Sequence, residues 1–108
     1  MTIATDVSTV TVTGSSGTQY SFKVYPWDTQ FKAVGAVYLV LRKSNPNFDL
    51  LYVGQTEDLS SRFDSHHKQP CFDRKGRTHI AVLVESSEAQ QLRIESDLVT
   101  KYQPSCNG

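Results

Sequence analysis

Two tyrosines, an arginine and a histidine are spaced along residues 35–66 so that their polar groups can meet. Tyr38 and Tyr52 stand in separate apolar runs, and Arg62 and His66 follow four residues apart, on one side of a predicted helix. Their hydroxyl, guanidinium and imidazole groups donate hydrogen bonds, bind anions and exchange protons. The stretch therefore serves either a chemical reaction or core packing. Which of the two it serves depends on the secondary-structure elements that position these side chains.

The tyrosine-bearing runs are typical of paired β-strands. Residues 36–41 are apolar at every position, as in a strand covered on both faces. A polar turn at 44–47 and a second apolar run at 50–53 predict an antiparallel pair with the two tyrosines on neighbouring strands. Gly54 then permits a sharp exit or the close approach of another group.

Further strands extend this unit in both directions. Alternating apolar residues at 10–12 and 20–24 predict a β-hairpin, which is either scaffold or a sheet extension able to pair with a partner. Residues 79–84 predict another strand. We expect an α+β fold in which residues 1–34 are an N-terminal hairpin extension packed on a compact domain of residues 35–108.

Two helices are expected. Thr56 or Asp58 is a suitable cap for the helix that carries Arg62 and His66. The second helix opens on the capping-box sequence that begins at Ser87 and runs to about Tyr102.

Glu95 is out of place on this second helix. The apolar positions of the helix are Ala89, Leu92, Leu98, Val99 and Tyr102, with Arg93, Asp97 and Lys101 on the outer side. Glu95 falls inside the apolar stripe, where an unpaired carboxylate costs at least several kcal/mol. The carboxylate is expected to pair with an arginine such as Arg62, to be protonated, or to bind a cation.

The composition is that of an ordinary globular protein. The 108 residues are 38% apolar and 20% charged, and most simply form one domain. No apolar run approaches the roughly 20 residues that span a bilayer, and the first ten residues lack a secretion signal. We therefore expect a cytoplasmic protein without a membrane partner. For Cys71 and Cys106 a single disulfide stays open, but two reduced thiols are favoured.

Two tripeptides carry the first part of a resemblance to a known family. Tyr52-Val53-Gly54 is one signature, and Ala36-Val37-Tyr38 is the other, with alanine in place of glycine directly after Gly35. In this order they resemble the signatures of the GIY-YIG nuclease domain. The connection between them is somewhat longer than in the compact family form, and Gln55 replaces a lysine of some relatives.

The remaining residues follow the family pattern in order and spacing. Arg62 lies ten residues after Tyr52, and His66 lies fourteen after it, where the family has its arginine and a histidine or tyrosine. Glu95 corresponds to the family's metal-binding glutamate, and Asn107 resembles the asparagine that closes the pattern. The resemblance spans residues 35–107.

This resemblance implies a fold and a reaction. The fold is a small antiparallel or mixed central sheet flanked by helices, extended here by the N-terminal hairpin. The reaction is hydrolysis of a phosphodiester in DNA, with Mg²⁺ or Mn²⁺ held by Glu95. Arg62 would bind the scissile phosphate and the charge that builds on it.

The resemblance also assigns the proton-transfer and supporting roles. Tyr38 would be the general base, which is ordinarily protonated at neutral pH and so needs help from cationic groups. His66 would give that help by hydrogen bonding or proton relay. Tyr52 would orient the water or the phosphate, Asn107 would steady the pocket, and Gly54 would be a supporting residue.

Basic residues gather between positions 62 and 79. Five lysines and arginines stand there against two aspartates, a local balance of +3 within a chain of zero net charge. Charge alone favours a solvated face. Beside a phosphate-cleaving pocket, the same residues would form a DNA-facing rim. The rim consists of His67, Lys68, Arg74, Lys75 and Arg77.

The sequence shows no helix-turn-helix, zinc finger or basic coiled coil. We therefore expect a structure-selective or weakly specific endonuclease, with specificity supplied by a partner protein or by self-association. One alternative is a catalytically weak module of the same fold that binds nucleic acid or protein. Another is a small interaction protein whose hairpin pairs edge to edge.

Overall fold

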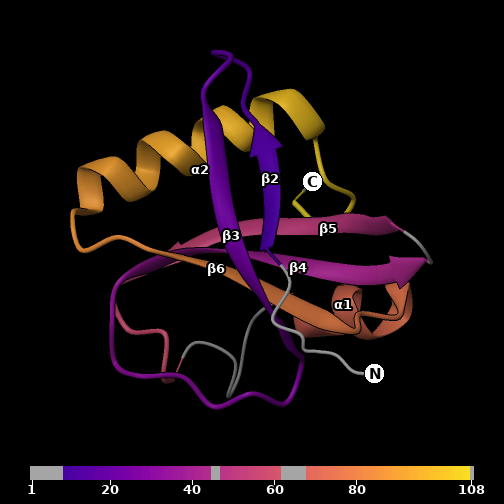
Figure 1. Ribbon diagram of the computed structural model, residues 1–108. Helices are drawn as coiled ribbons and strands as arrows, with labels where there is room; N and C mark the ends of the chain where they lie inside the picture. The colour runs from indigo at the N-terminus through magenta and orange to yellow at the C-terminus, as the bar shows by residue number, and fades with distance from the viewer. Residues whose placement is uncertain (1–8, 45–46, 62–67, 108) are drawn as a thin grey trace.

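Five strands build one antiparallel sheet in the computed structural model, which describes residues 9–44, 47–61 and 68–107 (Figure 1). Their order across the sheet is β2-β3-β6-β4-β5. The sheet is strongly twisted, so that β2 and β3 cross β4 and β5 at a steep angle in Figure 1. The strands are β2 (Thr9–Thr13), β3 (Gln19–Pro26), β4 (Ala36–Ser44), β5 (Asn47–Thr56) and β6 (His79–Val84).

Both predicted hairpins are present. Strand β2 pairs with β3, and β3 also pairs with β6, so the N-terminal hairpin continues the sheet of the rest of the chain. Strand β4 lies between β5 and β6. Its residues 36–41 are all buried, which confirms the prediction of a strand covered on both faces.

A separate hydrophobic cluster covers each face of the sheet. Tyr38, Tyr52 and Phe72 belong to one cluster, which includes helix α1 (Gln69–Lys75). Val37 and Leu98 belong to the other, which includes helix α2 (Glu88–Tyr102). In Figure 1, α2 lies above the sheet and α1 lies below it. No helix in the described ranges is both long and apolar enough to cross a membrane.

Helix α2 has the predicted bounds but a different buried side. The Ser87 side chain caps it by accepting a hydrogen bond from the Gln90 amide at 3.3 Å. The side chains that it buries are Gln91, Ile94 and Leu98, whereas Leu92 is 46% exposed. The predicted stripe through Leu92 was wrong, because a polar residue, Gln91, takes the inward position.

The Gln91 side chain fits against a glycine. Its Nε2 donates to the Glu85 carbonyl at 2.6 Å. A Cβ at Gly35 would lie 2.7 Å from that Nε2 and 2.8 Å from the Glu85 oxygen. The absence of a side chain at Gly35 therefore gives Gln91 room to turn inward.

The helix predicted after β5 does not begin at Thr56 or Asp58. The Asp58 carboxylate accepts hydrogen bonds from the Ser60 amide at 3.0 Å and from the Ser60 hydroxyl. Residues up to Ser61 form a bend and a turn rather than a helix. Helix α1 begins only at Gln69, with proline in its first turn. Arg62, His66 and His67 lie outside the described residues.

Asp97 is not on a free outer surface, contrary to the prediction. Its carboxylate accepts hydrogen bonds from the Ser16 amide, the Ser16 hydroxyl and the Tyr20 hydroxyl, each at 2.8 Å. A Cβ at Gly14 would overlap this carboxylate. Asp97 thus fastens the β2–β3 turn to α2.

Cys71 and Cys106 form a disulfide, with their Cα atoms 5.8 Å apart. The expectation of two reduced thiols was therefore wrong. The two cysteines are 35 positions apart in the sequence, but α1 and the segment after α2 meet at the same side of the sheet. The disulfide joins these two elements.

Candidate functional site

The two signature tyrosines lie side by side on one face of the sheet. Tyr38 is opposite Gly54 in the register of β4 and β5, and Tyr52 is opposite Val40. The two ring centroids are 6.1 Å apart, with 33° between the ring planes. The predicted antiparallel pairing thus brings both phenol groups to one place.

Gly54 makes room for this arrangement. A Cβ at position 54 would lie 2.5 Å from both Cζ and Oη of Tyr38, and 2.7 Å from Cε2 of Tyr52. Any other residue would displace one ring. The predicted close approach at Gly54 is confirmed, and the group that approaches is the Tyr38 phenol.

The tyrosines are also core residues. The Tyr38 side chain is fully buried, and 7% of Tyr52 is exposed. The row of rings continues from Tyr52 to Phe72 at 5.4 Å and from Phe72 to Trp27 at 5.9 Å. Trp27 and Phe72 were not among the predicted site residues, and no spacing in the sequence points to them.

The alanine of the first signature has a simple structural setting. Ala36 is fully buried at the start of β4, between Thr56 at the end of β5 and Val84 at the end of β6. The close contacts that require a glycine fall one residue earlier, at Gly35. Ala36 is thus accommodated in the core, and Gly35 is the position where a side chain would collide with Gln91 and Glu85.

Asn107 binds the backbone between the residues of the second signature. Its Oδ1 accepts from the Val53 amide and its Nδ2 donates to the Val53 carbonyl, both at 2.9 Å. The Cys106 amide donates to the Leu51 carbonyl at 2.8 Å. The yellow segment after α2 therefore lies along the outer edge of β5 (Figure 1). An amide side chain here takes the place of a neighbouring strand.

Glu95 lies on the side of the sheet opposite the tyrosine pair. It is half-buried on α2, next to Ile94, and α2 packs on the face opposite Tyr38. Within the described part of the chain, no three His, Cys, Asp or Glu side chains are grouped to hold a metal ion. A single carboxylate fits a hard cation that keeps several of its waters, such as Mg²⁺.

The described members of the predicted DNA-facing rim lie on and around α1. Lys68 precedes this helix, and Arg74 and Lys75 are exposed in its last turn. Arg77 is more constrained, because its guanidinium lies 4.4 Å from the Trp27 ring centroid and 3.2 Å from the Asp73 carboxylate. These residues share the sheet face of the tyrosines.

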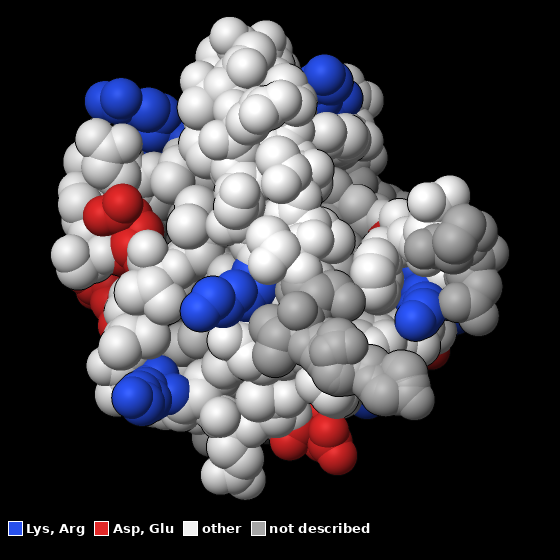
Figure 2. Space-filling view, viewed as in Figure 1, with Lys and Arg blue, Asp and Glu red and all other residues white. Residues whose placement is uncertain are grey.

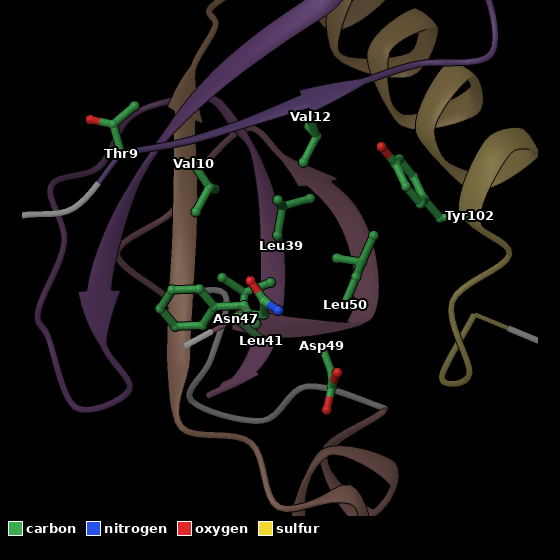
Figure 3. Close-up of a pocket in the computed structure, with 10 residues that line it drawn as sticks. Thr9, Val10, Val12, Leu39, Leu41, Asn47, Asp49, Leu50 and Tyr102 are labelled. Atoms are coloured by element: carbon green, nitrogen blue, oxygen red, sulfur yellow. The ribbon is translucent and has the colours of Figure 1, made fainter. Parts of the chain in front are cut away.

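A groove of about 730 Å³ lies on the opposite face. Figure 3 shows Val10 and Val12 from β2, Leu39 from β4 and Leu50 from β5 lining it, with Tyr102 at the end of α2. Figure 2 shows lysines, arginines and acidic residues scattered over one face of the molecule rather than gathered. The groove is lined mostly by apolar side chains and lies apart from the tyrosine pair.

Comparison with protein-family models, curated proteins and solved structures finds no match for this chain.

Proposed function

We propose that the chain is a metal-dependent DNA endonuclease that hydrolyses phosphodiester bonds with structure selectivity or weak sequence specificity. One observation carries the proposal. Tyr38 lies over Gly54, and Asn107 clamps Val53, so three positions far apart in the sequence meet at one point on β5. All of these positions belong to the GIY-YIG pattern, and their meeting on β5 supports the proposal.

The tyrosine pair supplies the proton-transfer chemistry. The Tyr38 hydroxyl acts as the general base toward the attacking water, and the Tyr52 hydroxyl orients the water or the phosphate. Gly54 and Asn107 fix the strand under these groups, which limits the motion of both rings.

The resemblance assigns to Glu95 a Mg²⁺ or Mn²⁺ ion, which would supply positive charge to the scissile phosphate. This role stays a prediction, because α2 packs on the face of the sheet opposite the tyrosine pair and the described geometry does not bring Glu95 to Tyr38. The roles of Arg62 as the phosphate ligand and of His66 as the aid to Tyr38 stay predictions, since both lie outside the described residues. Lys68, Arg74 and Lys75 would contact the DNA backbone without reading its sequence.

A plasmid-nicking assay tests the proposal. Supercoiled, branched and single-stranded DNA are incubated with the pure protein in Mg²⁺ and in EDTA. We expect cleavage in Mg²⁺ alone, reduced to the EDTA level by Glu95→Gln. The matched control is Glu88→Gln, an exposed glutamate of the same helix, which should cut like wild type.

The full burial of Tyr38 favours a second candidate, a catalytically weak module of the same fold that binds nucleic acid or protein. Binding of DNA by wild type and Glu95→Gln alike, with no cleavage of any substrate in Mg²⁺ or Mn²⁺, would select this candidate. A specificity partner or self-association and a cytoplasmic location also stay predictions. The disulfide counts against the cytoplasm, where thiols are kept reduced.

A further inference from the structure

Arg42 extends the tyrosine face along β4. Side chains alternate along a strand, so Tyr38, Val40 and Arg42 point to the same side of the sheet. Tyr38 and Val40 belong to the cluster on the α1 side. Four residues of strand at about 3.3 Å each place Arg42 about 13 Å beyond Tyr38.

The end of α1 lies next to Arg42. The helix closes at Gly76, in a left-handed conformation with φ of 77°, and a Cβ there would lie 3.6 Å from Cδ of Arg42. The Thr78 amide donates to the Leu41 carbonyl at 2.8 Å, which fixes this turn to β4. Arg42 is thereby joined to the basic turn that ends α1.

The charges of this surface are only partly balanced. Asp49 binds Arg42 at 2.5 Å, and Asp73 binds Arg77 at 3.2 Å. Two further cations, Arg74 and Lys75, are exposed in the last turn of α1. Four cations therefore stand against two aspartates, both of which are more than 40% exposed and open to competition from phosphate.

We infer that Arg42 and the basic turn of α1 (Arg74, Lys75 and Arg77) form a phosphate-binding surface along which the backbone of duplex DNA runs away from the tyrosine pair. The inference rests on the proposed function for the identity of the polyanion. A strand of DNA carries one phosphate per 3.4 Å of helix axis, so the 13 Å from Tyr38 to Arg42 corresponds to about four phosphates. Asp49 then competes with the phosphate for the Arg42 guanidinium and weakens the binding of DNA.

Salt-dependent binding to a short DNA duplex, measured in EDTA so that nothing is cut, tests this surface. Each lost phosphate contact flattens the slope of log K against log salt by about 0.9. Arg42→Gln should flatten the slope by about one contact, and Arg42→Lys should retain it. Asp49→Asn should tighten binding, because it frees the guanidinium. Circular dichroism checks that each variant is folded.

Lys43→Gln is the matched control. Lys43 is the next residue on the same strand, carries the same charge, and points to the other side, 6.0 Å from the Phe48 ring centroid. Its loss should leave the slope close to that of wild type. An equal slope for Arg42→Gln and wild type, an equal loss for Lys43→Gln, or weaker binding by Asp49→Asn would overturn the inference.

These results separate the surface from the reaction. If wild type cuts DNA but Arg42→Gln leaves the slope unchanged, the endonuclease stands and the surface is wrong. If the slopes change as expected but no DNA is cut in Mg²⁺, the surface stands and the endonuclease fails.

Discussion

At position 54 a hydrogen atom stands where other residues have a Cβ, and the Tyr38 phenol occupies that space. We predict that Gly54→Ala lowers the free energy of unfolding by about 1–3 kcal/mol, the usual cost of overfilling a packed core. Urea denaturation measures the loss. The same variant should also impair cleavage, because it shifts the general base.

A double-mutant cycle isolates the contact between the two residues. In a Tyr38→Leu background the new methyl group meets a smaller side chain, so Gly54→Ala should cost much less there than in wild type. Equal costs in the two backgrounds would show that the penalty arises from the backbone of residue 54 and not from the Tyr38 ring.

At the scale of elements, Asp97 couples the N-terminal hairpin to α2. Hydrogen bonds from Tyr20 and Ser16 hold the pKa of this carboxyl below its ordinary value of 3.8, because they stabilise the charged form. The charged carboxylate therefore stabilises the folded state. This stabilisation is complete above pH 3.8 and is lost as the pH falls through the pKa that Asp97 has in the folded state. Acid should therefore undock the hairpin from α2.

The melting temperature between pH 6 and pH 2 measures this effect. Asp97→Asn should melt lower than wild type at pH 6 and approach it at pH 2, whereas Asp28→Asn, at an exposed position, should follow the wild-type curve. A constant difference between wild type and Asp97→Asn over the whole range would contradict the assignment.

The disulfide is the second coupling between elements, since it joins α1 to the segment that carries Asn107. Closing a loop of 35 residues lowers the entropy of the unfolded chain and is worth about 4 kcal/mol at 25 °C. Dithiothreitol should therefore shift the urea midpoint of wild type downward. The double variant Cys71→Ser/Cys106→Ser should start at the reduced midpoint and show no response to the reductant.

At the scale of the whole molecule, the sheet was largely predictable. Unbroken apolar residues at 36–41 and alternation at 20–24 predicted strands, because a strand covered on two faces and one covered on a single face differ in pattern. The two hairpins were predicted, but the position of β6 between β3 and β4 was not. The antiparallel pair with Tyr38 and Tyr52 on neighbouring strands was predicted, whereas the register that places Tyr38 opposite Gly54 was not.

The structural features that could not be predicted from the sequence depend on contacts between distant segments. Gln91 turns inward because Gly35 and Glu85 accommodate it, and neither lies near it in the helical repeat. The disulfide and the Asp97 clamp are of the same kind, with partners 35 and 81 positions apart. No local pattern carries such information.

The rate of plasmid nicking by Tyr38→Phe tests the central claim most directly. This variant removes one hydroxyl from the ring that lies over Gly54 and leaves the Glu95 carboxylate unchanged. We predict that the variant keeps the DNA affinity and melting temperature of wild type. Its rate of nicking in Mg²⁺ should fall by about 10²-fold or more, the usual contribution of a general base. Nicking by Tyr38→Phe at the wild-type rate, or no nicking by wild type on any DNA substrate, would contradict the account.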